Sequence, residues 1–478
     1  MLFHFPLQNY KNILICTNFF VPLHSISIMQ TICAISSPYG VGGIAVIRVS
    51  GERAISIVNG LFRGRVALTD AQAGTVHFGR ICRELEKEGE SELEVLDEVL
   101  CSVFHAPHSF TGEETVEIAC HGSLFIQQEL LRWLIDAGCR AAEPGEFTRR
   151  AFLNGKMDLA QAEAVADLIA AQSKAEKDLA LSQLRGSVSK ELKDLRERLL
   201  HFTSLIELEL DFADHEELEF ANRTQLKDLS DEIEQKLHSL LASFRTGNAI
   251  RNGIPVAIIG APNVGKSTLL NALLGEQRAI VSDIQGTTRD TIEDTLIIDG
   301  ILFRLIDTAG LRETCDQLEN LGIERSRKAA EQAQIIVLVK DASLQDGANT
   351  YSLEVKGKVI EVLNKADLQP PMTNAKSPML SISAKYNEIE PLKRELVRVA
   401  RESLQTSAVM LSNARHYEAV SRAHEAIMRV QEGLSSGLSG DLLSLDLQDC
   451  LSALGEVTGQ ITNQEVLSNI FSKFCIGK

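Results

Sequence analysis

A strand, a glycine-rich loop and a helix in direct succession constrain the fold of this chain more than any other feature. Residues 255–259 (PVAII) have the pattern of a buried strand, residues 260–267 read GAPNVGKS, and residues 268–274 have a helical pattern. A GxxxxGK[ST] loop in this context is typical of a phosphate-binding loop, because its backbone N–H groups turn towards phosphate at a helix N-terminus. This segment therefore predicts an α/β nucleotide-binding domain.

Two residues of the loop have predicted roles. Lys266 is expected to reach the β- and γ-phosphates, and the Ser267 hydroxyl to bind Mg²⁺. A second strand pattern, residues 301–306, ends in DTAG (residues 307–310), which would place a carboxylate beside Mg²⁺ and a glycine at the γ-phosphate.

Two later motifs indicate that the base is guanine. The strand pattern of residues 359–363 ends in NKAD (residues 364–367), and Ser383-Ala384-Lys385 follows another strand. The Asp367 carboxylate can accept hydrogen bonds from N1–H and the exocyclic amine of guanine, which adenine does not offer, so such a site discriminates strongly. In this order after a phosphate-binding loop, the motifs predict a GTPase.

The nucleotide-site motifs resemble those of translation-factor-class GTPases, but the residue after DTAG departs from Ras-like proteins. Those proteins carry a Gln directly after the motif to orient the attacking water, whereas this chain has Leu311, which cannot do so. Arg289 is a candidate catalytic group, but a structural role in a switch loop explains it at least as well.

Helical patterns lie on both sides of the α/β segment. Leu192, Leu195 and Leu199 begin an apolar stripe at helical spacing, and helical patterns return over residues 414–433, 442–455 and 465–474. A helical pattern without Gly or Pro also runs from Asp158 to Gly186. The simplest arrangement is one helical domain with an α/β domain inserted into it.

The N-terminal part has a different pattern. Strand patterns at residues 44–49, 99–104 and 115–119 and a helical pattern at 124–137 predict a compact α+β domain. The acidic run of residues 84–98 is expected to be a solvated hairpin or loop. Residues 1–28 are apolar but interrupted by Pro and Asn, and we interpret them as a start-site artefact or a loose extension, with a membrane anchor as the weaker alternative.

Charge and cysteine content limit the classes of function. The net charge of −17 disfavours binding nucleic acid through a basic surface as a whole, so a nucleic-acid partner must meet a local patch or another protein. The nine cysteines are scattered without metal-binding spacing, which favours reduced thiols and a cytoplasmic location.

Motifs along nearly the whole chain resemble the tRNA-modification GTPase family MnmE (TrmE). The motifs are GGIAVIRVSG (42–51), FTGEE (110–114), HG (121–122), PGEFT (144–148), RAFLNGKMDLAQAE (150–163) and the terminal FCIGK (474–478). The resemblance implies a multi-domain fold: an α+β folate-binding-like domain at 29–147, a helical domain at 148–250 and 402–478, and an inserted Ras-like G domain at 251–401.

The resemblance also implies potassium-activated GTP hydrolysis, in which K⁺ offsets charge that builds up in the transition state. Its ligands would be Asn263, Ser282, Ile284 and Thr287, and Thr288 would join Ser267 on Mg²⁺. The residues expected at GTP are Asn263, Val264, Gly265, Lys266, Ser267, Thr268, Ser282, Asp283, Ile284, Gln285, Gly286, Thr287, Thr288, Asp307, Thr308, Ala309, Gly310, Asn364, Lys365, Asp367, Ser383, Ala384 and Lys385.

The family installs a carboxymethylaminomethyl-type group at C5 of the wobble uridine of certain tRNAs, with an FAD-dependent MnmG-type partner. Its one-carbon unit comes from a 5,10-methylene- or 5-formyl-tetrahydrofolate, for which the matching positions are Arg48, Glu117, Lys156 and Lys478. The resemblance further implies a homodimer through the N-terminal domain and no stable membrane association.

Two further catalytic candidates come from the same resemblance and from local chemistry. Glu319 matches the family's proposed general base or water-orienting residue, although an exposed acidic side chain is the simpler interpretation. Cys475 lies near Lys473 and Lys478, which could lower its pKa, but an unreactive thiol is the favoured interpretation. The competing functions are a GTPase switch in ribosome assembly and a membrane-associated GTPase.

Overall fold

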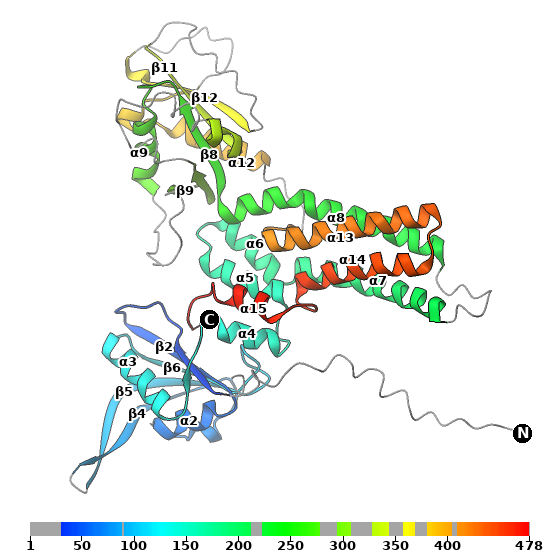
Figure 1. Cartoon of the computed structure of the whole chain (residues 1–478). Helices are drawn as coiled ribbons and strands as arrows, with labels where there is room; N and C mark the ends of the chain where they lie inside the picture. The colour runs from blue at the N-terminus through cyan, green and yellow to red at the C-terminus, as the bar shows by residue number, and fades with distance from the viewer. Residues whose placement is uncertain are drawn as a thin grey trace, which may run out of the picture. The chain divides into compact units, whose positions relative to one another are not determined.

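The computed structural model describes residues 30–87, 90–211, 222–277, 294–306, 327–343, 357–368, 380–403 and 409–477. The chain divides into two compact units (Figure 1). One unit joins the N-terminal residues up to Asp158 with the C-terminal residues from Asn463 onward, and the other comprises residues 159–462.

The first unit is built on a seven-stranded sheet in the order β3-β4-β5-β6-β2-β1-β7. Neighbouring strands are antiparallel, except that β1 and β7 are parallel. Helices α2 (Ala54–Leu61) and α3 (Leu124–Asp136) share a core with it. The strands are β1 (Ile32–Ile35), β2 (Ile44–Ser50), β3 (Phe62–Gly64), β4 (Thr75–Lys87), β5 (Glu90–Phe104), β6 (Thr115–His121) and β7 (Arg140–Ala141).

The α+β prediction for this region is confirmed element by element. The strand patterns at 44–49, 99–104 and 115–119 lie within β2, β5 and β6, and the helical pattern at 124–137 is α3. The acidic run expected as a hairpin or loop belongs to the long hairpin of β4 and β5. Alternate residues of these strands, such as Ile47 and Val49, are fully buried, which explains why the period-two pattern was readable.

The C-terminal segment folds with the first unit. Helix α15 (Gln464–Phe471) packs on α4 (Glu146–Leu153), with the Phe152 and Phe471 ring centroids 6.5 Å apart. Residues 402–478 were predicted to be one segment of the helical domain. In the structure the residues from Asn463 onward belong to the first unit, where Phe471 of α15 is buried beside α4 and the loop before it.

The helices of the second unit form a bundle around one apolar core (Figure 1). Helices α13 and α8 pack along each other, and α14 packs on both α7 and α13. The stripe predicted from Leu192 onward lies in α7 and is fully buried at Leu192, Leu195 and Leu199. The helices are α5 (Leu159–Ala170), α6 (Lys174–Leu184), α7 (Ser187–Asp211), α8 (Arg223–Asn252), α13 (Ala414–Ser436) and α14 (Gly440–Thr458).

The helical pattern from Asp158 to Gly186 forms two helices, α5 and α6. The chain breaks between α5 and α6, and Ser173 is the N-cap of α6. The Ser173 hydroxyl accepts a hydrogen bond from Glu176 N, while the Glu176 carboxylate accepts hydrogen bonds from the backbone N–H groups of Gln172 and Ser173. This capping box starts a new helix without the Gly or Pro that commonly marks a break in a helical pattern.

The α/β part of the second unit contains a six-stranded sheet in the order β13-β12-β11-β8-β10-β9. All neighbours are parallel except β10 and β9. In the sequence this part lies between α8 and α13, two helices that pack on each other. The elements are β8 (Ile254–Gly260), α9 (Lys266–Gln277), β9 (Asp294–Ile298), β10 (Ile301–Leu305), β11 (Ile335–Asp341), β12 (Lys358–Asn364), β13 (Leu380–Ser381) and α12 (Glu390–Ser403).

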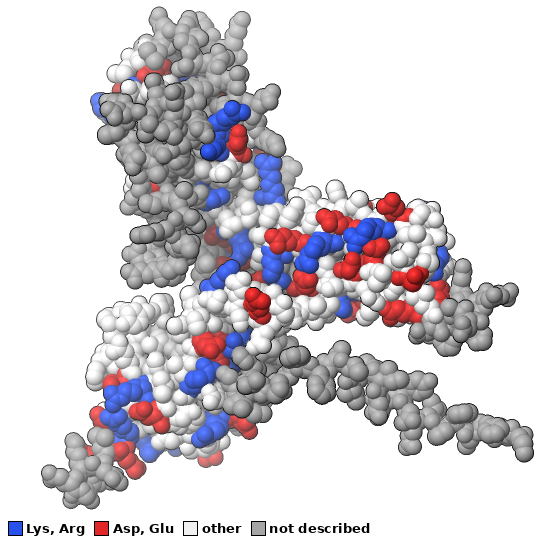
Figure 2. Space-filling view, in the orientation of Figure 1, with Lys and Arg blue, Asp and Glu red and all other residues white. Residues whose placement is uncertain are grey.

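Charged side chains of both signs are mixed along the helical bundle on the face shown in Figure 2. Several form ion pairs between neighbouring helices, such as Arg422 with Glu456 and Arg429 with Asp446. Among the described residues, no helix combines the length and the apolar character needed to cross a membrane.

Candidate functional site

The phosphate-binding loop connects β8 to α9 as the sequence predicts. Strand β8 ends at Gly260 and α9 begins at Lys266, whose Nζ donates hydrogen bonds to the carbonyl oxygens of Gly260 (3.0 Å) and Ala261 (2.8 Å). Burial lowers the pKa of the Lys266 ammonium. A desolvated cation at a helix N-terminus is a strong attractor for phosphate.

Asn364 joins three parts of the site that are far apart in the sequence. Its Nδ2 donates a hydrogen bond to Val264 O in the loop (2.9 Å), and its Oδ1 accepts one from Ala384 N (3.0 Å). The side chain is buried, with 3% of the residue exposed. The buried amide therefore holds the phosphate-binding loop and the predicted base-binding loop in one fixed arrangement.

The loop passes so close to Asn364 that only glycine fits at position 265. A Cβ atom on Gly265 would lie 2.3 Å from Asn364 Nδ2, and the residue has φ +93°. Both the close approach and the positive φ exclude an ordinary side chain. The loop backbone at Gly265 therefore lies directly against the Asn364 side chain.

The predicted base-binding residues are also held together. Ser383 Oγ donates a hydrogen bond to Asp367 Oδ1 (2.7 Å), and the Asp367 side chain is exposed beside this bond. Lys365 Nζ pairs with Asp341 Oδ2 at 2.6 Å. Burial disfavours the charged carboxylate, but hydrogen bonds from Lys365 and Ser343 hold the pKa of Asp341 below its usual value. Asp341 was not among the predicted site residues, although it lies at the carboxyl end of β11, where site residues of a parallel sheet are expected.

The structure thus brings three of the predicted groups together: residues 263–268, 364–367 and 383–385. The other nucleotide-site predictions lie outside the described residues. These are Ser282, Asp283, Ile284, Gln285, Gly286, Thr287, Thr288, Arg289, Asp307, Thr308, Ala309, Gly310 and Glu319.

In the first unit, two of the predicted folate residues form a pair. Arg48 on β2 and Glu117 on β6 are register partners, and Arg48 Nε and Nη2 donate to Glu117 Oε1 at 2.9 and 2.8 Å. The Arg48 guanidinium carbon lies 5.2 Å from the centroid of the Phe110 ring and 5.6 Å from that of Phe147. Aromatic contacts and a shared carboxylate fix the guanidinium in a partly buried position.

The other predicted folate residues approach the same region from different elements. Lys156 Nζ donates to Pro107 O (2.8 Å), and its aliphatic chain lies against Gly112 in the loop that also carries Phe110. The C-terminal tail lies against β1, where Ser36 Oγ donates to Gly477 O (3.2 Å). Lys478 lies outside the described residues. Cys475 is exposed, and its carbonyl accepts a hydrogen bond from Gly145 N (3.4 Å).

The family-like motifs of the N-terminal part also contain a buried charge network with no predicted role. The Arg150 guanidinium, 2% exposed, donates to the carboxylates of Glu113 and Glu146. Glu113 in turn accepts a hydrogen bond from Ser50 (2.8 Å). The network connects the FTGEE loop, β2 and α4 beside the Arg48–Glu117 pair. The sequence feature that could have predicted it is the presence of charged residues within otherwise apolar motifs.

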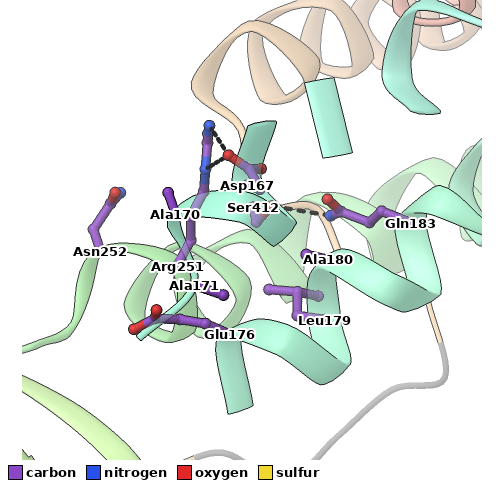
Figure 3. Close-up of a pocket in the computed structure, with 10 residues that line it drawn as sticks. All are labelled: Asp167, Ala170, Ala171, Glu176, Leu179, Ala180, Gln183, Arg251, Asn252 and Ser412. Carbon is purple, nitrogen blue, oxygen red and sulfur yellow. Dashed lines mark hydrogen bonds and ion pairs between the residues drawn. The ribbon is translucent and has the colours of Figure 1, made fainter. Parts of the chain in front are cut away.

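A pocket of about 210 Å³ lies where α5, α6 and the end of α8 meet (Figure 3). Arg251 Nε and Nη2 donate to Asp167 Oδ1 at 3.1 and 2.7 Å at its edge. Burial raises the pKa of both Asp167 and Glu176, and Glu176 Oε1 has no hydrogen-bond partner among the described residues. The pocket therefore offers a buried acceptor, and the Arg251 pair links α5 to the residues directly before β8.

A phosphate-binding loop lies between β8 and α9, and Asn364 connects it to the loops around the exposed Asp367 carboxylate. This arrangement defines a P-loop nucleotide-binding domain. Here that domain is accompanied by a helical bundle and an N-terminal α+β unit. The profile described as "MnmE helical domain" matches residues 159–475, and the profile "GTP-binding protein TrmE N-terminus" matches residues 31–156. The chain belongs to the MnmE (TrmE) family.

The sequences of curated relatives match this chain along nearly its whole length. A protein of Parabacteroides distasonis named tRNA modification GTPase MnmE is 54% identical, covering 94% of this chain and 100% of that protein. Proteins of the same name from Phocaeicola vulgatus and Porphyromonas gingivalis are 50% and 49% identical, each with 99% of its length covered and with 94% and 95% of this chain. The solved G domain of the T. maritima FeoB iron transporter is 23% identical, covering 32% of this chain and 99% of that one, with a TM-score of 0.23, too low to inform the fold.

Proposed function

We propose that this protein is a potassium-activated GTPase that, with an FAD-dependent MnmG-type partner, adds a carboxymethylaminomethyl-type group to C5 of the wobble uridine of certain tRNAs. The observation that carries the GTPase part is the Asn364 side chain, which bonds both Val264 O and Ala384 N. Membership of a family whose curated relatives are named tRNA modification GTPase supports the tRNA-modification part.

The nucleotide site is proposed to work as a guanine-specific P-loop site in an inserted Ras-like domain, residues 251–401. The strand order with one antiparallel edge strand, and the position of the sheet between α8 and α13, support this assignment. Asp367 would accept hydrogen bonds from the guanine edge, and Lys266 would lie on the phosphates. Ser267 and Thr288 would hold Mg²⁺.

Potassium is proposed to bind at the oxygens of Asn263, Ser282, Ile284 and Thr287. Asn263 is the member of this set that the structure describes, and its φ of +62° places it in the left-handed region at the tip of the loop. A monovalent cation there would offset negative charge on the phosphates, the task that an arginine performs in other GTPases. Glu319 is proposed to orient the attacking water in place of the Gln that Leu311 replaces.

The N-terminal unit is proposed to bind a 5,10-methylene- or 5-formyl-tetrahydrofolate and to form the homodimer contact. The Arg48–Glu117 pair, Lys156 and the C-terminal tail all lie around β1, β2 and the loop at 107–112, which supports one shared site. A carboxylate suits the amide edge of a pterin, and basic groups suit a glutamyl tail. The domain boundaries proposed are 29–147, 148–250 with 402–478, and 251–401, with residues 1–28 as an extension. Within 402–478, the part from Asn463 onward packs with the first unit.

The cytoplasm is the proposed location, because tRNA is the proposed substrate. The structure describes seven free cysteines, and six of them are buried, as expected for thiols that stay reduced. No stable membrane association is proposed.

Hydrolysis of GTP and ATP by the full chain, measured in KCl and in NaCl at equal ionic strength, tests the GTPase proposal. We expect hydrolysis of GTP but not ATP, with a rate in K⁺ at least about tenfold above that in Na⁺. The Asn263→Ala variant should lose the difference between the two salts. Equal rates in K⁺ and Na⁺ for the unmodified chain would contradict potassium activation, and hydrolysis of ATP would contradict the guanine site.

A further inference from the structure

Two histidines and a glutamate meet between the helices α8 and α13, outside every site described above. Glu234 and His238 belong to α8 and His424 to α13. One ligand atom from each side chain lies within 4.8 Å of the others.

The helix geometry explains why these side chains come together. Glu234 and His238 are four residues apart on one helix, so they share a face. Their face meets α13 along a seam of contacts: Gln431 donates to Asp231 (2.8 Å), and Phe244 stacks on Tyr417 with ring centroids 4.4 Å apart. Residue numbers rise along α8 as they fall along α13, so the two helices run antiparallel and His424 faces Glu234 and His238.

The three side chains lie near enough to one another that a small movement would bring their ligand atoms around one ion. His424 Nε2 and Glu234 Oε1 are 3.1 Å apart, and the ring centroids of His238 and His424 are 6.0 Å apart. The Glu234 and His424 side chains are 30% and 17% exposed, and His238 is exposed. Tetrahedral Zn²⁺ with bonds of about 2.0–2.2 Å needs ligand atoms about 3.4 Å apart, so a small rotation of the His238 side chain would complete the set.

We propose that Glu234, His238 and His424 bind a divalent transition-metal ion, Zn²⁺ in the first place, and that this ion clamps α8 to α13. Two imidazoles and one carboxylate are ligands that Zn²⁺ accepts, with water in the fourth position. Mg²⁺ requires oxygen ligands in near-octahedral geometry, so this site would not compete for the Mg²⁺ of the nucleotide site.

The position of the proposed metal ion between α8 and α13 gives the ion a structural role. Helix α8 ends at Asn252, directly before β8, and α13 begins at Ala414, after α12. An ion between them would therefore fasten together the two helices that lead into and out of the α/β part. We expect the ion to stabilise the folded chain against heat, because a ligand that binds only the folded state shifts the unfolding equilibrium.

Zn²⁺ titration of the full chain in a thiol-protecting reductant, in competition with a chromophoric chelator, tests the proposal. We expect the unmodified chain to bind one equivalent of Zn²⁺ tightly (the tight equivalent). We expect the affinity for this Zn²⁺ to fall at least about tenfold in His424→Ala and in His238→Ala. His201→Ala is the matched control, because His201 is an exposed histidine on α7 that does not belong to the group, and its loss should leave the tight equivalent intact.

Two further measurements keep the test decisive. Because His238 is exposed, His238→Ala should keep the far-UV circular dichroism of the parent without metal, so loss of binding there reports the ligand and not the fold. Substitution by Co²⁺ should give a tetrahedral spectrum without a thiolate-to-metal band. An undiminished tight equivalent in both histidine variants, or a thiolate band that identifies cysteine as the ligand, would overturn the proposal.

Discussion

Glu163 on α5 and Arg415 on α13 form a two-point ion pair between residues 252 positions apart in the sequence. Arg415 Nε donates to Oε1 at 3.0 Å and Nη2 to Oε2 at 2.9 Å, while His416 Nε2 lies 2.6 Å from Oε2. Glu163 is 8% exposed and His416 is 3% exposed. The buried pair therefore closes the helical bundle across the α/β part that separates the two helices in the sequence.

The pH dependence of stability follows from this pair. Burial alone would raise the pKa of Glu163, but His416 and Arg415 lower it from 4.5 to about 2. A carboxylate with a lowered folded-state pKa contributes stability that is present above about pH 4.5 and is lost as the pH falls towards 2. We expect Glu163→Gln to lower the free energy of unfolding at pH 7 by about 3 kcal/mol, with the difference from the parent shrinking over that acid range.

An exposed pair provides the control for this prediction. Hydrogen bonding to Arg198 lowers the pKa of Glu232 to about 2 as well, but the two side chains are 42% and 40% exposed. Because water screens that pair, Glu232→Gln should change the free energy of unfolding by less than about 1 kcal/mol in urea titrations. Equal losses in both variants would contradict the importance of burial.

Asp367 should control the choice of base. An Asn side chain presents an N–H₂ group where the carboxylate accepts from guanine N–H groups, and xanthine offers an oxygen there. We expect Asp367→Asn to weaken GTP binding by roughly 100-fold and to improve binding of xanthosine triphosphate, measured with fluorescent nucleotides. Unchanged GTP affinity would remove Asp367 from the site.

Gly265 should be irreplaceable, whereas a nearby glycine should not be. In Gly265→Ala the new methyl group would collide with Asn364 Nδ2, so we expect GTP affinity to fall at least about tenfold. A Cβ on Gly275, in the exposed part of α9, meets nothing within 4 Å, so Gly275→Ala should keep GTP affinity and add about 0.5–1 kcal/mol of stability. Similar effects of the two substitutions would contradict the close approach in the loop.

Glu117 should affect folate and not GTP. It holds the partly buried Arg48, so we expect Glu117→Gln to weaken binding of 5-formyl-tetrahydrofolate by at least about tenfold while GTP hydrolysis is unchanged. Glu98→Gln is the matched control, because Glu98 pairs with Arg80 on the same sheet but is half exposed. Equal folate affinity in both variants, measured by equilibrium dialysis, would exclude the pair from the folate site.

Glu319 is predicted to act in turnover and not in binding. Glu319→Ala should reduce the rate constant for GTP hydrolysis by at least about 100-fold while the dissociation constant for GTP stays within about twofold. Single-turnover kinetics separate the two quantities. An unchanged rate constant would remove Glu319 from the mechanism.

Local sequence patterns were sufficient to predict much of the fold. Strand β8, its loop and α9 could be predicted because the phosphate-binding motif requires that order. Strands β2 and β6 could be predicted because one face of each is buried, which gives an alternating apolar pattern. The break between α5 and α6 was missed because a capping box at Ser173 begins the new helix without a glycine or proline. The docking of α15 on α4 was missed because a helical pattern shows an apolar face but not what covers it.

The candidate sites show the same division between local and long-range information. The sequence placed Asn364 and Gly265 in motifs, but their contact depends on how β12 and the loop meet in the folded sheet. The pair of Asp341 with Lys365 joins the end of β11 to the residue that follows β12, and His424 reaches Glu234 only because α8 and α13 pack together. Such contacts depend on tertiary packing, which no single motif encodes.

The most direct test of the central claim is nucleoside mass spectrometry of bulk tRNA from cells with and without this protein. The proposed function predicts loss of carboxymethylaminomethyl-type wobble uridines in the deficient cells and their return when the gene is restored, but not when the Gly265→Ala variant is supplied. Unchanged tRNA nucleosides, with ribosomal subunits accumulating instead, would contradict the modification role and favour a GTPase switch in ribosome assembly.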